Sequence, residues 1–168
     1  MFEKETRPGG AFRYAGKAPL FQEVAATQRS FDLYIADLVA ACVHKGVEFR
    51  FETDITAVPD LLAPFDRIII ATGASYRFGL GPLATTLLDW GAGRWPGVAN
   101  LLSSPALRDW FYYRGRRATA ARFSRLAKPG QVVTVIGDAA APGKSKQAIA
   151  SAFEAALLQP LHAQRGSA

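Results

Sequence analysis

The chain has very few of the side chains that build disulfides and metal sites. Its 168 residues include one cysteine and two histidines. A single cysteine excludes a disulfide framework and a multi-cysteine metal site. Cys42 lies in the apolar run 38–43, which predicts a buried, unreactive thiol. Neither His44 nor His162 has a potential ligand at metal-binding spacing. We therefore assign no metal site, and no catalytic residue, from the sequence.

The sequence also lacks a long hydrophobic run. No apolar stretch reaches the ~18 residues that a membrane-spanning helix needs. No basic start followed by an apolar segment marks a signal peptide. We therefore expect a cytoplasmic protein without a membrane partner. The hydrophobic content of 49%, with 11% aromatics, predicts a domain with a packed core.

Acidic side chains are scarce in one part of the chain. The net charge is +6, and residues 108–128 contain seven basic side chains and one acid, Asp109. Aromatic and basic residues lie together in 110–117, a composition typical of surfaces that bind single-stranded nucleic acid. A solvated helix, or one that has lost a contact with another domain, has the same composition. We favour that second interpretation and do not expect a nucleic-acid partner.

Two stretches have the spacing of helices. Apolar residues recur at every third or fourth position after Ser30, which is a plausible N-cap, and Gly46 is a plausible C-terminal stop. An alanine-rich helix is predicted over 145–158.

Four stretches have the composition of strands. Unbroken apolar runs over 67–71 and 132–136 predict strands that are covered on both faces and pair in parallel as neighbours. Alternation predicts another strand over 47–51, and a short strand is expected at 98–102. The succession of strands and helices predicts an α/β fold.

The first candidate binding residues lie at the start of the chain. Glu3 ends an extended segment, and Gly9 and Gly10 follow it in a turn. A carboxylate in this place can accept hydrogen bonds from ribose hydroxyls, while the glycines allow the backbone to approach a ligand. A solvated surface acid before a turn is the alternative interpretation.

The other candidates follow the two buried strands. Thr72 and Gly73 end the strand over 67–71, and Gly137 and Asp138 end the strand over 132–136. In open α/β sheets ligands bind at the carboxyl ends of the strands, where an aspartate can accept hydrogen bonds from a polyol. A purely structural N-cap role for Asp138 is the alternative interpretation.

Gly137 also begins a segment that looks like a phosphate-binding loop, because Gly143, Lys144 and Ser145 follow it. A P-loop requires four residues between its glycines, and this segment has five, 138–142. The additional residue disrupts the ring of backbone N–H groups, so we do not predict a P-loop.

In combination, these strand ends resemble a known family. An acid followed by Gly-Gly (Glu3 and Gly9-Gly10), a Gly-Val-Glu-Phe strand (46–49), an Ala-Thr-Gly-Ala strand end (71–74) and an Ile-Gly-Asp-Ala strand end (136–139) occur in that order. The series is similar to the FAD/NAD(P)-binding half of the old-yellow-enzyme-like NADH:flavin oxidoreductases, the group of 2,4-dienoyl-CoA reductase and trimethylamine dehydrogenase.

The resemblance implies a partial Rossmann-like parallel sheet flanked by helices, and FAD as the cofactor. The contacts that it implies are Glu3 on the adenosine ribose, Gly10 near the pyrophosphate, the Ile55 backbone near adenine, Thr72 and Gly73 at the crevice, and Asp138 on the ribityl chain. Gly9 and Gly137 are further cofactor-binding candidates.

The resemblance also implies a division of the chain. Residues 1–74 and 131–160 correspond to the FAD-binding domain, 75–130 to a shortened insertion in place of the NAD(P)H-binding domain, and 161–168 to a tail. No G-x-G-x-x-G unit precedes Glu3, and the family's flavin-binding barrel is not in this sequence.

We therefore expect a component or fragment of an FAD-dependent NAD(P)H oxidoreductase, with weak or no FAD binding by the chain alone and NAD(P)H used by the complete protein. The expected partner is a missing N-terminal segment or a separate flavin-barrel chain. The alternative is a non-catalytic split subunit or interaction remnant that pairs with a chain carrying the missing strand and helix.

Overall fold

The computed structural model describes residues 1–17, 27–77 and 80–157. The predicted tail at 161–168, with His162, lies outside these ranges. In chain order the elements are α1 (Phe12–Ala15), α3 (Gln28–His44), η1 (Pro59–Leu62), β1 (Arg67–Ile70), β2 (Ser75–Tyr76), α4 (Leu80–Asp89), η3 (Ala92–Arg94), α5 (Pro96–Leu102), α6 (Pro105–Tyr113), β3 (Arg116–Arg117), α7 (Ala120–Ser124), β4 (Val132–Val135), η4 (Gly137–Ala139) and α8 (Ser145–Leu157).

The two apolar runs form neighbouring parallel strands, as predicted. β1 pairs with β4 from Arg67↔Val132 to Ile70↔Val135. The pairing extends beyond the strand ends, because the Ile136 N–H donates to the Ile70 carbonyl at 3.0 Å. Helices and a small parallel sheet are therefore combined in one chain.

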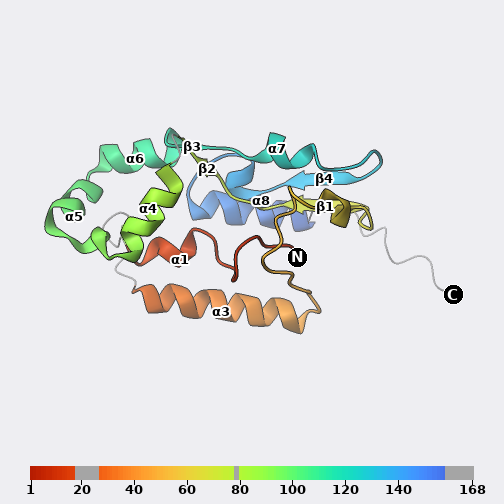
Figure 1. Ribbon diagram of the computed structural model, residues 1–168, viewed down its shortest axis with the longest axis horizontal. Helices are drawn as coiled ribbons and strands as arrows, with labels where there is room; N and C mark the ends of the chain where they lie inside the picture. The colour runs from red at the N-terminus through yellow and green to blue at the C-terminus, as the bar shows by residue number, and fades with distance from the viewer. Residues whose placement is uncertain (18–26, 78–79, 158–168) are drawn as a thin grey trace.

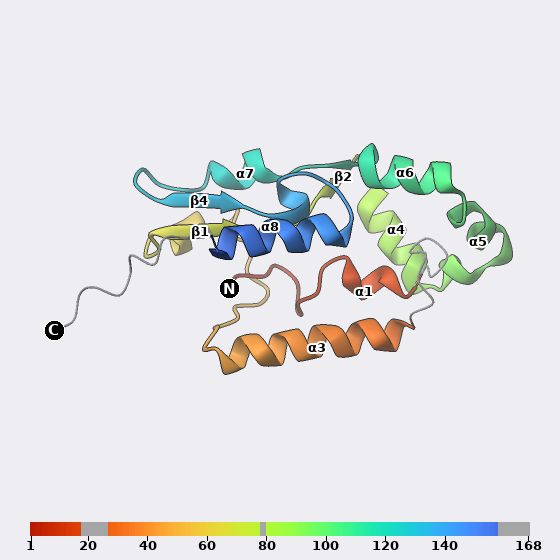
Figure 2. The ribbon, with the colours of Figure 1, turned by 180° about the vertical axis from the view of Figure 1, so that it is seen from behind.

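The elements are distributed over three regions. Figures 1 and 2 show β1, β4, α7 and α8 together at one end and α4, α5 and α6 at the other. In both views α1 lies between the N-terminal half of α3 and α4. The antiparallel pair of β2 and β3 connects the two ends.

The prediction of a strand over 47–51 is wrong. Only one parallel bridge forms there, between Phe2 and Arg50. The Arg50 N–H donates to the Met1 carbonyl at 2.8 Å, and the Glu3 N–H donates to the Arg50 carbonyl at 2.9 Å. Two residues later Glu52 adopts φ 52°, which is outside the extended region, so the segment does not continue as a regular strand.

The strand expected at 98–102 is also wrong, because these residues belong to helix α5. Pro96 occupies the first turn of that helix, where a missing N–H costs no hydrogen bond and the fixed φ favours a helix. A short apolar run does not by itself distinguish a strand from a helix.

The predicted helix after Ser30 begins earlier than expected. Its N-cap is Thr27, whose side-chain oxygen accepts from the Ser30 N–H at 3.3 Å. Gly46, at φ 79°, follows the helix in the left-handed conformation that commonly ends helices. Cys42 is half-buried, not fully buried as predicted.

Very little of the described chain is fully buried. The buried apolar side chains are Ala15, Leu62, Ile70, Ala92 and Ala139. The two strands were predicted to be covered on both faces, and this is wrong in part: Ile69 of β1 is 54% exposed and Val132 of β4 is 56% exposed. Within the described ranges no helix is long and apolar enough to cross a membrane.

Candidate functional site

The carboxyl ends of β1 and β4 lie at the same edge because the strands are parallel. Thr72 and Gly73 follow β1, and Gly137 and Asp138 follow β4. Thr119 joins the two strand ends. Its hydroxyl donates to the Gly73 carbonyl at 2.6 Å, and its N–H donates to the Ala139 carbonyl at 3.1 Å. The structure thus brings four predicted site residues together.

The hydroxyls at this edge form a short chain of hydrogen bonds. Since the single hydroxyl hydrogen of Thr119 is used on Gly73, the Thr72 hydroxyl is the donor in its 2.8 Å contact with the Thr119 oxygen. Thr119 was not predicted from the sequence. It is 46 residues from Gly73, and no local pattern indicates such a contact.

The Asp138 carboxylate is paired with an arginine. Arg116 of β3 donates from Nη1 to Asp138 Oδ2 at 2.5 Å and from Nη2 to the Gly143 carbonyl at 2.6 Å. The second carboxylate oxygen, Oδ1, accepts from the Gly143 N–H at 3.0 Å. The arginine is 8% exposed. A carboxylate has about four acceptor positions, so Asp138 can still accept two further hydrogen bonds.

These contacts give Asp138 a structural role that the sequence only partly indicated. The aspartate fixes the loop that leads into α8 by binding Gly143, two residues before that helix begins. It also connects the loop to β3 through Arg116. Arg116 was grouped with a solvated basic segment in the sequence, whereas the structure buries it.

Gly137 permits a close approach between β4 and α8. Its φ is 59°, and a Cβ atom there would lie 3.3 Å from the Cβ of Ala148. The Gly137 N–H donates to the Ser151 hydroxyl at 2.8 Å. The glycine is therefore needed for backbone conformation and helix packing.

The loop from Gly137 to Ser145 has no phosphate-binding arrangement. A P-loop offers its backbone N–H groups to a phosphate. Here the Gly143 N–H is bound to Asp138, and the Lys144 N–H donates to Gln147 Oε1 at 2.7 Å. Both groups are satisfied within the protein, in agreement with the extra residue in the sequence.

The first predicted residues form a separate group. Glu3 is half-buried, and its Oε1 accepts from the Glu5 N–H at 3.0 Å. The Thr53 N–H donates to the Glu3 carbonyl at 2.9 Å, which places Glu3 near the segment that contains Ile55. Within the described residues, no hydrogen bond joins Glu3 or Ile55 directly to the edge at Gly73 and Asp138.

The two predicted glycines of this group differ in their surroundings. Gly9 has φ 117°, and a Cβ there would lie 2.7 Å from Ile35 Cδ1 on α3. Gly10 has φ 47° and open space beside it. The turn therefore packs on α3 through Gly9, whereas no side chain or backbone atom of the described residues packs against the position that a Cβ would take at Gly10.

Helix α7 bridges the two groups indirectly. Arg122 Nη2 donates to the Thr56 hydroxyl at 3.2 Å, and Thr56 follows Ile55. Asp54 Oδ1 accepts from both the hydroxyl and the N–H of Thr56, at 2.7 and 2.9 Å. These hydrogen bonds, with smaller contributions from Arg122 and Lys4, lower the pKa of Asp54 below its usual 3.8.

Tyr76 lies beside the Arg116–Asp138 pair. Its pKa is raised above 10.0, mainly because burial disfavours the phenolate. Nearby Arg116 opposes this shift and Asp138 adds to it. The phenol is therefore protonated throughout the neutral range.

No group of three potential metal ligands occurs within the residues that the structure describes. Comparisons with protein families, with curated proteins and with solved structures found no match to this chain.

Proposed function

We propose that the chain is a component of an FAD-dependent NAD(P)H oxidoreductase that passes electrons between a nicotinamide and a flavin, as its resemblance to the old-yellow-enzyme-like reductases implies. The observation that supports this proposal most directly is the edge formed by two neighbouring parallel strands. It carries Thr72 and Gly73 beside Gly137 and Asp138, an arrangement found where ligands bind in open α/β sheets.

The described residues fit part of an FAD molecule. Asp138 keeps two acceptor positions for ribityl hydroxyls, and Glu3 is a half-buried acid that can accept from the adenosine ribose. The cofactor would supply the redox chemistry, and these side chains would bind and orient it.

The loop between β4 and α8 does not fit the pyrophosphate of FAD. Binding such a group usually relies on unpaired N–H groups at a helix N-terminus. The N–H groups of Gly137, Gly143 and Lys144 are all bound within the protein. We therefore expect the chain alone to bind FAD weakly and to purify without colour.

The arrangement of backbone edges indicates what would complete the sheet. In a parallel strand, alternate residues direct their N–H and C=O groups to opposite sides. The backbone groups of Ile70 form hydrogen bonds with β4, so those of Ile69 point to the opposite side of β1. Arg50 binds Met1 and Glu3, so the backbone groups of Phe2 likewise point away from Arg50. Within the described chain neither Ile69 nor Phe2 has a partner on that side.

These two edges are near each other. The Phe2 ring packs edge-on against Phe65, with centroids 6.0 Å apart, and Phe65 lies two residues before β1. One further parallel strand between the edges would join both pairs into a single sheet. A helix connected to that strand would cover apolar side chains that are now exposed, among them Ile69 of β1.

The test supplies that strand and measures flavin. A segment with an apolar strand, a G-x-G-x-x-G turn and a helix is fused before Met1, and FAD affinity is measured by quenching of flavin fluorescence. We expect the fusion to purify yellow. Glu3→Ala and Asp138→Ala should each weaken FAD binding by roughly ten- to a hundredfold, as expected for a charge-assisted hydrogen bond of about 1.5–3 kcal/mol. Lys144→Ala, at an exposed position, is the matched control and should leave affinity unchanged.

Two results would contradict the proposal. Stoichiometric flavin in the isolated chain would show that the pyrophosphate site is complete without the added strand. A fusion that becomes more stable but binds no flavin would instead support the second candidate, a non-catalytic subunit that pairs with a chain carrying a strand and a helix. The exposed strand edges are compatible with both candidates, and flavin binding by the fusion distinguishes them.

A further inference from the structure

The short antiparallel pair β2–β3 places basic side chains on both of its faces. Ser75 pairs with Arg117, and Tyr76 pairs with Arg116. Since neighbouring residues in a strand point to opposite faces, Ser75 and Arg117 share one face, and Tyr76 and Arg116 share the other. Arg77 continues the face of Ser75, and its N–H donates to the Gly115 carbonyl at 2.9 Å.

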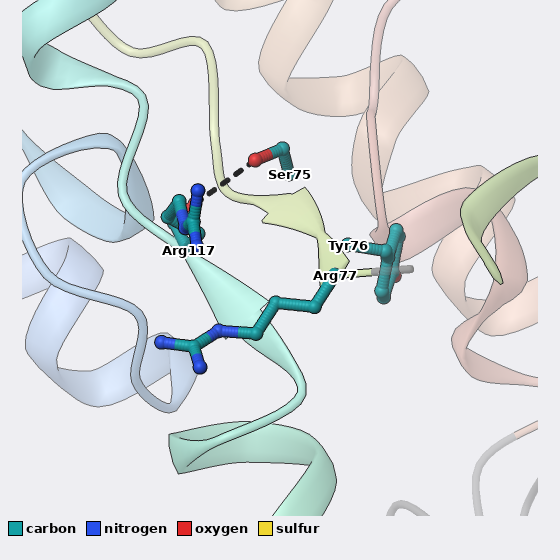
Figure 3. A pocket seen from close by; sticks show the side chains of 4 residues that line it. All are labelled: Ser75, Tyr76, Arg77 and Arg117. Atoms are coloured by element: carbon teal, nitrogen blue, oxygen red, sulfur yellow. Dashed lines mark hydrogen bonds between the residues drawn. The ribbon is translucent and has the colours of Figure 1, made fainter. Parts of the chain in front are cut away.

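The two faces differ in how their charge is compensated. Arg116 is buried and paired with Asp138. Arg77 and Arg117 are exposed, and in the described part of the chain neither forms an ion pair. Figure 3 shows these two side chains on the same side of the strand pair, with the Tyr76 ring on the other side. One face therefore carries two uncompensated positive charges.

A half-open pocket of about 310 Å³ lies beside the strand pair, lined by Ser75, Arg77 and Arg117 of this face and also by Tyr76. The Ser75 hydroxyl donates to the Arg117 carbonyl at 3.4 Å, a long contact that a ligand oxygen can replace by rotation about χ1. The pocket has the volume of a small-ligand site, and none of its lining residues is acidic.

The surrounding sequence strengthens the positive potential. Residues 67–137 contain ten basic side chains and only two acids, Asp89 and Asp109. Asp89 forms an ion pair with Lys17, and two of the ten basic residues, Arg116 and Lys128, are paired with Asp138 and Asp60. A pocket with two exposed guanidinium groups in such surroundings attracts anions.

We propose that this pocket binds the phosphate group of a small phosphorylated molecule. A phosphate carries up to two negative charges and several acceptor oxygens, which match two guanidinium groups better than a single carboxylate does. The volume leaves room for part of the organic group. The pocket lies on the face of β3 opposite to Arg116, which pairs with Asp138 of η4. It adjoins the proposed flavin edge, because Ser75 and Arg117 are two residues from Gly73 and Thr119, respectively.

The experiment uses the purified chain and measures binding of inorganic phosphate, inorganic pyrophosphate and AMP by isothermal titration calorimetry at low ionic strength. We expect pyrophosphate to bind more tightly than phosphate. Arg77→Gln and Arg117→Gln should each weaken pyrophosphate binding about tenfold or more, and the double variant should abolish it. Equal affinity for phosphate and AMP would identify free phosphate as the ligand, whereas tighter binding of AMP would identify a phosphorylated molecule.

Arg29→Gln, at an exposed position of α3, removes the same charge away from the pocket and should leave affinity unchanged. Circular dichroism of each variant confirms that the fold is retained. If Arg29→Gln weakens binding as much as Arg77→Gln does, the proposal is overturned, because binding would then depend on net charge and not on the pocket. An absence of binding by all three probes would also overturn it. The proposal is also overturned if a single-stranded oligonucleotide binds more tightly than pyrophosphate and its binding depends equally on Arg29, Arg77 and Arg117.

Discussion

Replacing Arg116 by methionine should destabilise the protein strongly. The substitution removes the 2.5 Å ion pair with Asp138 and the 2.6 Å hydrogen bond to the Gly143 carbonyl. It leaves a carboxylate whose side chain is only 22% exposed without its counter-charge. Breaking one partner of a buried pair costs about 3–5 kcal/mol. Because Asp138 keeps the Gly143 N–H and some contact with water, we expect a loss of about 3 kcal/mol, a large part of the ~5–15 kcal/mol that stabilises a typical domain.

The free energy of unfolding can be measured by urea denaturation followed through tryptophan fluorescence. The double variant Arg116→Met with Asp138→Asn removes both charges, and it should be more stable than Arg116→Met alone by about 1–2 kcal/mol. Lys128→Met is the control. It removes an exposed 3.0 Å ion pair with Asp60, and it should cost less than about 1 kcal/mol. Asp138→Asn is measured alone as the second single variant. If the double variant loses the sum of the losses of Arg116→Met and Asp138→Asn, the two side chains are not coupled and the reasoning fails.

Two further predictions concern the N-terminal turn and the segment after it. Gly9→Ala should cost roughly 1–3 kcal/mol, because its φ is 117° and Ile35 Cδ1 would lie 2.7 Å from the new Cβ; urea denaturation should show a smaller loss for Gly10→Ala, where the space is open. The Asp54 carboxyl should titrate below 3.8 by NMR and shift upward in Thr56→Val, which removes the hydroxyl donor. Since the folded-state pKa of Asp54 is the lower one, its stabilising effect is present at neutral pH and is lost as the pH falls through that value; an unchanged midpoint in Thr56→Val would contradict this.

The strand pairing was predictable because it depends on local composition. The apolar runs that became β1 and β4 are β-branched and unbroken, and such runs favour buried parallel strands. The helix after Thr27 was predictable from its apolar spacing, although its first residue was not. The short apolar run at 98–102 does not distinguish a strand from a helix, and Pro96 in the first turn favours the helix that forms.

The contacts at the strand ends were not predictable. Arg116 reaches Asp138 across 22 residues, and Thr119 reaches Gly73 across 46. Both depend on how the segment between β1 and β4 folds back over the sheet edge. A single sequence shows that segment as basic and aromatic, and it contains no sign that one arginine is buried while its neighbour, Arg117, is exposed.

Among the described residues, no strand pairs with the side of β1 that faces away from β4, and this has a consequence for the behaviour of the chain at high concentration. An exposed strand edge can pair with the same edge of a second molecule, and proteins commonly block this with charged residues or proline. In β1 the only charged residue is Arg67. We therefore expect repulsion between molecules of net charge +6 to be the main barrier to edge-to-edge association. Salt screens that repulsion within about 10 Å at 0.1 M, so added salt should favour self-association and low ionic strength should keep the molecules apart.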